Sequence, residues 1–113
     1  MSDQIPFHIG ARVVLVVEHQ LTMVPEFGTV VRYNFHSAWI EWDGAAEGLE
    51  VEHEMDELYI PSIQELKDAA AAHAVGALHE AAVGNAQAAR DERNALLAYA
   101  AEVRKQLAKA AAR

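Results

Sequence analysis

The stretch Leu58-Tyr-Ile-Pro-Ser-Ile-Gln-Glu-Leu66 marks the point where the chain changes from strands to helix. Its first three residues predict a short strand, which Pro61 helps to end. Ser62 and Glu65 then form a capping box, in which the serine hydroxyl accepts from the Glu65 amide and the glutamate reaches back to the serine amide. The sequence therefore predicts strands before this proline and helix after it.

Composition and charge also change at Pro61. Of the 23 alanines in the 113 residues, 19 follow it. Residues 1–60 carry 11 acidic and two basic residues, a net charge of −9, whereas residues 61–113 carry six and seven, a net charge of +1. The sequence therefore predicts two domains, an acidic one over residues 1–60 and an alanine-rich helical one over residues 61–113.

Five short β-branched or aromatic runs precede Pro61, separated by turn residues. The predicted strands are residues 12–18, 27–33, 38–42, 49–53 and 58–60. Because strand side chains alternate, Leu49, Val51 and His53 are expected to face the core and the glutamates between them to face solvent. Five strands in so few residues cannot form a flat sheet with two dry faces, so we expect the sheet to curl into a small barrel.

Several features of residues 10–60 are shared by one kind of small barrel. They are Gly10 with Val13, the glycine-led strand Phe27–Val31, the strand Trp39–Gly44 ending in Asp-Gly, and the short closing strand at Leu58. In these features the region resembles the Src homology 3-like barrels, including Tudor-like and KOW-like modules. The resemblance implies a five-stranded barrel that binds peptides, modified side chains or nucleic acid and does not catalyse a reaction.

The alanine-rich region is predicted to be helical from Ile63 to Ala112. As one rod it would be about 75 Å long, whereas a 50-residue barrel is roughly 25 Å across. The rod is therefore too long to bury its apolar side on its own barrel. Either it breaks at Gly84-Asn85, with Gly76 as a second weak point, and folds back as a hairpin, or it stays long and pairs with other copies.

Two apolar stripes support helix pairing. One is a small-residue face: Ile63, Leu66, Ala70, Ala74, Ala77, Leu78 and Ala81. The other has heptad spacing and is the predicted oligomerisation seam: Leu96, Ala100, Val103 and Leu107. The predicted fold class is α+β, a five-stranded Src homology 3-like β-barrel followed by a long helix or helical hairpin that joins copies into a dimer or tetramer.

An acidic run dominates the end of the predicted barrel. Eight acidic residues lie between Glu41 and Glu57, and no lysine or arginine occurs between Arg32 and Lys67. Such a surface attracts a basic partner, although a solvated face that protects a sheet edge is the simpler alternative. The predicted partner-binding residues are Glu41, Asp43, Glu50, Glu52, Glu54 and Asp56.

Aromatic and basic residues form a second candidate surface. Single-stranded bases stack on exposed aromatic rings, whereas the alternative is that Tyr33 and Trp39 pack across the sheet. Basic residues of the last helix either form a positive stripe or are simply solvated. The candidate nucleic-acid-binding residues are Arg32, Tyr33, Phe35, His36, Arg90, Arg93, Arg104 and Lys105.

Catalytic and metal signatures are absent from the sequence. The chain has no cysteine, no phosphate-cradling glycine loop and no Ser-His-Asp set, and His73 and His79 lack the spacing of metal co-ligands. We therefore expect no catalytic residue, cofactor or metal. The start of the chain lacks a secretory pattern and no apolar run could cross a bilayer, so the sequence predicts a cytoplasmic protein without membrane association.

These features together predict a non-catalytic macromolecule-binding protein. We expect an oligomeric adaptor or inhibitor that presents acidic barrels to a protein partner and gains avidity from several copies. Its compact, cysteine-free, alanine-rich style resembles that of small phage or mobile-element proteins. Alternatives are a single-stranded nucleic-acid-binding accessory protein in phage-type transcription or replication, and a structural virion component.

Overall fold

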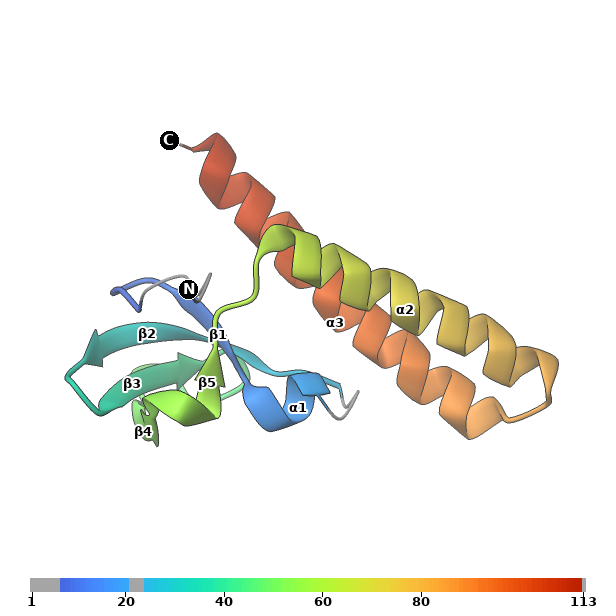
Figure 1. Cartoon of the computed structure of the whole chain (residues 1–113), viewed down its shortest axis with the longest axis horizontal. Helices are drawn as coiled ribbons and strands as arrows, with labels where there is room; N and C mark the ends of the chain where they lie inside the picture. Colours follow the sequence, from blue (N-terminus) through green and yellow to red (C-terminus); the bar gives the residue numbers. More distant parts are fainter. Residues whose placement is uncertain (1–6, 21–23, 113) are drawn as a thin grey trace. The chain divides into compact units, whose positions relative to one another are not determined.

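The computed structural model describes residues 7–20 and 24–112 (Figure 1). In this range the chain divides into two compact units. A β unit contains residues 7–20 and 26–61, and a helical unit contains residues 62–112 together with residues 24 and 25. The division at Pro61 agrees with the change in composition at that residue.

The β unit is one antiparallel sheet of five short strands. They are β1 (Arg12–Leu15), β2 (Phe27–Tyr33), β3 (Ser37–Trp42), β4 (Val51–Glu54) and β5 (Leu58–Tyr59). Their order in the sheet is β4-β3-β2-β1-β5. The α+β class is confirmed. Among the described residues β4 and β5 are the two edges of the sheet, so it is not closed into a barrel.

The first strand is shorter than predicted. The sequence predicted a strand over residues 12–18, but β1 ends at Leu15 and a short helix, α1 (Val16–Gln20), follows. β1 pairs with β2 over residues 12–14 and with β5 over residues 14–15. Among the described residues, Val16 and Val17 pair with no other strand, and β propensity alone does not hold a strand there.

The core of the β unit follows the predicted alternation. Val13, Val30, Ala38, Ile40 and Leu58 are buried together. On β4, Val51 and His53 are half-buried while Glu52 and Glu54 are exposed. A single 3₁₀ turn, Met55–Glu57, links β4 to β5. The predicted faces of Val51, His53 and the glutamates are therefore confirmed, but the core position predicted for Leu49 is wrong, because β4 begins only at Val51 and Leu49 is 51% exposed.

The helical unit is a hairpin of two long helices. They are α2 (Ile63–Ala82) and α3 (Ala86–Ala111), which lie antiparallel and side by side (Figure 1). Ser62 and Glu65 form the predicted capping box. α3 has 26 residues and α2 has 20, so α3 is longer by about 9 Å.

The helices are separated by a break at Gly84. This glycine has a φ of 82°, a left-handed conformation that ends helices and that residues with a Cβ rarely adopt. Asn85 then caps α3, because its side chain accepts a hydrogen bond from the Ala88 amide at 3.3 Å. Of the two alternatives that the sequence left open, the hairpin with a break at Gly84-Asn85 is the one observed, and Gly76 lies inside α2. No helix in the described part of the chain is both long and apolar enough to span a membrane.

Candidate functional site

The predicted acidic surface is partly neutralised by arginines from neighbouring strands. Arg12 forms a two-pronged ion pair with Asp43, with Nη1 2.8 Å from Oδ1. Arg32 donates from Nε to Glu50 at 2.9 Å. The sequence distance between these residues is large, but the antiparallel order of β1, β2, β3 and β4 brings them together. Two of the predicted partner-binding carboxylates, those of Asp43 and Glu50, are therefore already paired with an arginine.

Two more of these carboxylates have backbone partners. Glu41 accepts from the Gly48 amide at 3.2 Å, and the Glu54 side chain accepts from the amide of Glu57 in a capping box. Glu52 and Asp56 are exposed, and among the described residues they make no ion pair. The acidic surface thus reduces to a small area around β4 and the turn after it.

The aromatic β2–β3 hairpin presents one fully exposed ring. Phe35 is 95% exposed, and Tyr33 and His36 are also exposed. Tyr33 lies opposite Ala38, because the register shifts between Val30 and Arg32. Trp39 therefore faces Arg32, whose guanidinium carbon lies 4.5 Å from the centre of its ring. The suggested pairing of Tyr33 with Trp39 is wrong, because Tyr33 pairs with Ala38 and Trp39 pairs with Arg32.

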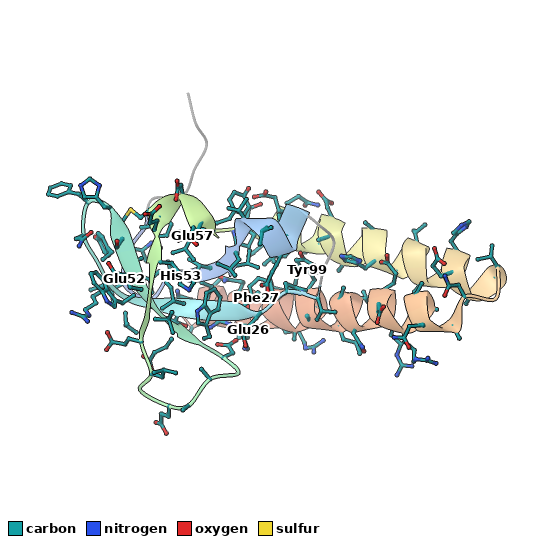
Figure 2. All side chains as sticks on the ribbon, turned by 90° about the horizontal axis from the view of Figure 1, so that it is seen from below. Glu26, Phe27, Glu52, His53, Glu57 and Tyr99 are labelled. Atoms are coloured by element: carbon teal, nitrogen blue, oxygen red, sulfur yellow. The ribbon has the colours of Figure 1, made fainter. Side chains whose placement is uncertain are left out.

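His53 belongs to a small polar group on the sheet. The Trp42 indole Nε1 donates to His53 Nε2 at 3.2 Å, and the two rings meet edge-to-face. Glu57 lies on the other side of the imidazole, with its carboxylate 3.9 Å from Nδ1 (Figure 2). In the described part of the chain no three histidine, aspartate or glutamate side chains are placed to hold a metal ion.

A second histidine joins the two long helices. His73 on α2 is 5% exposed, and its Nδ1 lies 2.6 Å from a carboxylate oxygen of Glu92 on α3. Its ring also stacks on Tyr99 of α3, with 5.5 Å between ring centres. These contacts lie inside the hairpin and hold α2 against α3. His73 is buried, whereas the Glu92 side chain keeps 29% of its exposure.

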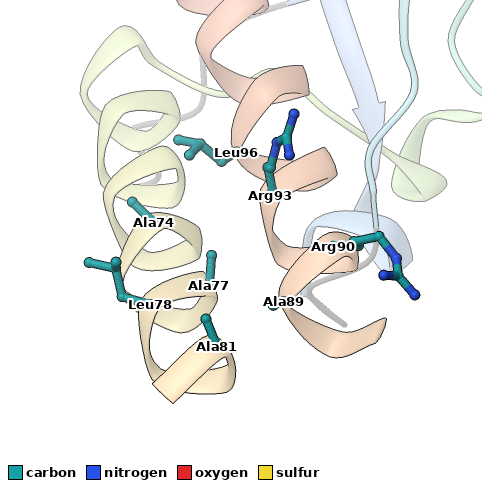
Figure 3. Close-up of a pocket in the computed structure, with 8 residues that line it drawn as sticks. All are labelled: Ala74, Ala77, Leu78, Ala81, Ala89, Arg90, Arg93 and Leu96. Atoms are coloured by element: carbon teal, nitrogen blue, oxygen red, sulfur yellow. The ribbon is translucent and has the colours of Figure 1, made fainter. Parts of the chain in front are cut away.

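An apolar groove runs along one side of the hairpin and is a candidate site. Its volume is about 490 Å³, and α2 and α3 each contribute four lining residues (Figure 3). These residues are Ala74, Ala77, Leu78 and Ala81 from α2, and Ala89, Arg90, Arg93 and Leu96 from α3. The alanines leave the space open, and Leu78 beside it is 74% exposed.

The groove unites two stripes that the sequence showed separately. The small-residue face of α2 supplies Ala74, Ala77, Leu78 and Ala81, and the seam of α3 supplies Leu96. The rest of the seam, Ala100, Val103 and Leu107, continues along the same side of α3, because these residues follow Leu96 at intervals of four, three and four. The hairpin therefore covers only part of its apolar surface within the helical unit.

The candidate nucleic-acid-binding residues are divided between the two units. Arg32, Tyr33, Phe35 and His36 belong to the β unit, whereas the four others belong to α3. Arg90 and Arg93 line the groove. Arg104 follows Arg93 by 11 residues, about three turns, and so lies on the same side of α3. Lys105, one residue further, lies about 100° around the helix and off this side.

The groove was not predicted as a binding site because its residues looked like packing residues. One feature could have indicated the groove: a hairpin aligns Ala74, Ala77 and Ala81 with Ala89 and Leu96. This alignment appears only once the break is placed at Gly84-Asn85. No known protein family matches the chain, and no curated protein and no solved structure matches it. The function is therefore inferred from the groove and the two candidate surfaces of the β unit.

Proposed function

We propose that the protein is a non-catalytic protein-binding protein whose helical hairpin receives a helix of a partner protein in its open groove. The observation that supports this proposal is the apolar groove between α2 and α3, beside which Leu78 is 74% exposed. An amphipathic helix laid into such a groove buries apolar surface on both sides and packs by interdigitation of side chains.

The chemistry of the lining favours a helix over a small molecule or a substrate. Alanine, leucine and arginine are the only residue types that line it. Small-molecule sites instead combine an apolar wall with several placed hydrogen-bonding groups that fix the orientation of the ligand. The lining also offers no nucleophile and no carboxylate or imidazole for acid–base chemistry. Docking of an amphipathic helix requires only the shape and the apolar surface of the groove.

The experiment is an NMR titration of the isotope-labelled full chain with a neutral amphipathic peptide. The peptide carries a leucine and alanine stripe, with glutamine and serine at its other positions. We expect shifts of amide signals in the segments 74–81 and 89–96. Leu78→Gln should weaken binding about tenfold or more, since burial of a leucine contributes roughly 1.5–3 kcal/mol.

Val75→Gln is the matched control. Val75 is 67% exposed on the same helix but does not line the groove, so its substitution should leave the affinity unchanged. Equal affinity of Leu78→Gln and the unsubstituted chain would contradict the proposal. The absence of binding by peptides of every charge would contradict it as well.

The acidic area of the β unit is a second candidate surface for a protein partner. Exposure of Glu52 and Asp56 without an ion pair in the described part of the chain supports it. We also propose that the sheet, in which β1 lies between β2 and β5, is the Src homology 3-like module expected from residues 10–60. Glu52→Lys with Asp56→Lys tests the acidic surface, because it should abolish capture of a basic partner and leave the fold intact.

Nucleic-acid binding is supported by one observation, the 95% exposure of Phe35. An exposed ring at the tip of a hairpin offers a stacking surface for a base. A labelled single-stranded oligonucleotide should then bind at low salt and bind less well to Phe35→Ala. The absence of any binding at low salt would exclude this alternative.

A further inference from the structure

Resting on the proposed helix docking, we infer that the partner helix is acidic, with an apolar stripe flanked by aspartate or glutamate. The inference comes from the charges that surround the groove. Arg90 and Arg93 line it. Every other charged residue of the hairpin can be placed relative to the groove from the bounds of α2 and α3 and the helical repeat of 3.6 residues.

Two further positive charges lie on the groove side. Lys67 precedes Ala74 by seven residues and Leu78 by 11, about two and three turns, so all three lie on one side of α2. Arg104 extends the side of Arg93 in the same way. Lys67, Arg90, Arg93 and Arg104 are all exposed. We call these four residues the basic rim of the groove.

Most acidic residues of the hairpin lie elsewhere. Three of them are nine residues, or two and a half turns, from a residue on the groove side, and therefore face the other way. They are Glu65 relative to Ala74, Asp68 relative to Ala77, and Glu102 relative to Arg93. Asp91 is two residues, about 200°, from Arg93. Glu80 follows Ala77 by three residues and therefore borders the groove side, where it is half-buried.

The sixth acid, Glu92, precedes Leu96 by four residues and keeps 29% of its side-chain exposure, but its carboxylate is paired with His73 at 2.6 Å. Among the described residues, Lys67, Arg93 and Arg104 pair with no carboxylate. Arg90 donates to Gln87, a neutral amide. The hairpin thus leaves the basic rim without counter-charges, so an acidic partner meets it without displacing internal ion pairs.

A second copy of the chain is a poorer occupant. A two-fold pairing through this groove would bring the basic rim of one copy against that of the other, and like charges across an interface oppose association. Nucleic acid is also a poorer occupant, because its phosphates would pair with the arginines but would not cover the apolar alanine and leucine lining of the groove. A helix with an apolar stripe and acidic flanks satisfies both parts of the surface.

The experiment uses three labelled peptides with one apolar stripe and different flanks. The flanks are glutamate, glutamine or lysine, and each peptide is about 14 residues, or roughly 21 Å, long when helical. This is about the distance from Lys67 to Ala81 along α2. Fluorescence polarisation measures their affinities for the full chain, and NMR locates the binding site. We expect the acidic peptide to bind about threefold to tenfold tighter than the neutral one, and the basic peptide to bind most weakly.

Charge reversal of the basic rim should reverse this order. Arg90→Glu with Arg93→Glu is expected to favour the basic peptide over the acidic one. Lys105→Glu with Lys109→Glu is the matched control, because it changes the net charge equally but lies on the other side of α3. In this control the acidic peptide should still bind best. The preference of the unsubstituted chain should also decrease as salt is added.

The possible results separate the inference from the proposed function. Equal affinity for the acidic and basic peptides would overturn the inference and leave helix docking in place. Binding of no peptide would overturn both. Displacement of the acidic peptide by an oligonucleotide that shifts the same groove signals would assign the basic rim to nucleic acid. Occupation of the groove by a second copy at low salt, seen as concentration-dependent shifts of its signals, would also overturn the inference.

Discussion

At the scale of single residues, Gly28 is the glycine at which an added Cβ would come closest to another atom. It lies opposite Trp42 in the pairing of β2 with β3. A Cβ at this position would lie 2.5 Å from Cγ2 of Ile40 and 3.0 Å from the carbonyl oxygen of Glu41. Gly28→Ala should therefore lower the free energy of unfolding by about 1–3 kcal/mol through overpacking.

Urea denaturation followed by tryptophan fluorescence measures this loss, since Trp39 and Trp42 both belong to β3. Gly44→Ala is the control. There a Cβ would meet only the carboxylate end of the exposed Glu26 side chain, which can move away. A loss for Gly44→Ala as large as that for Gly28→Ala would contradict the explanation from strand packing.

The contact between His73 and Glu92 is the second residue-scale feature. Glu92→Leu removes the partner of His73 Nδ1 and leaves a buried polar atom unsatisfied, which should cost about 1–3 kcal/mol. Adding His73→Phe removes the other partner as well and keeps a ring that can stack on Tyr99. The double variant should therefore be less destabilised than the sum of the two single variants.

Thermal unfolding followed by far-ultraviolet circular dichroism reports on the two long helices and measures this coupling. The double-mutant cycle isolates the interaction from the separate effects of each substitution. Strict additivity would mean that the contact at 2.6 Å contributes nothing to the stability of the hairpin.

At the scale of elements, the turn between α2 and α3 determines whether the apolar stripes meet. Gly84 holds a φ of 82°, and a residue with a Cβ is strained in that conformation. Gly84→Ala should destabilise the hairpin by about 1 kcal/mol. Gly84→Asn should cost less, because asparagine tolerates left-handed backbone. Circular dichroism during urea denaturation checks this order, and equal stabilities would contradict it.

Elements with local signals could be predicted from the sequence. β2 was predicted at its observed residues, and the capping box at Ser62 and the break at Gly84-Asn85 each depend on a few adjacent residues. The end of β1 could not be predicted, because it depends on where β2 and β5 stop pairing with it. Propensity alone favoured a continued strand through Val16 and Val17.

The candidate site could be predicted less well than the elements, for the same reason. The pairing of Arg12 with Asp43 depends on strand order, and the contact of Arg32 with Trp39 depends on a register shift. The groove depends on how α2 and α3 align. Each stripe was visible in the sequence as a packing surface, but sequence periodicity does not say which parts of two stripes cover one another.

At the scale of the whole molecule, charge separates the two units. The acidic residues concentrate before Pro61, and residues 61–113 are nearly neutral with a net charge of +1. Inside the helical unit the basic rim lies on the groove side and most acids lie on the other side. The predicted oligomerisation seam, Leu96, Ala100, Val103 and Leu107, shares the side of α3 that carries Arg93 and Arg104. Self-association through this seam remains a prediction. The nearby positive charges imply that it depends on salt concentration.

Self-association requires that salt screen the positive charges of the basic rim. At low salt the four positive charges of each copy should oppose pairing, whereas at about 1 M salt the Debye length is only about 3 Å and the repulsion is largely removed. We therefore expect sedimentation equilibrium to show less self-association at low salt than at high salt.

The variant Arg93→Gln with Arg104→Gln should self-associate more readily at low salt, because it leaves the apolar seam intact and removes two charges. Lys105→Gln with Lys109→Gln should not, since these residues lie on the other side of α3. Self-association that is strongest at low salt would instead point to attraction between oppositely charged surfaces, such as the acidic β unit of one copy and the basic rim of another.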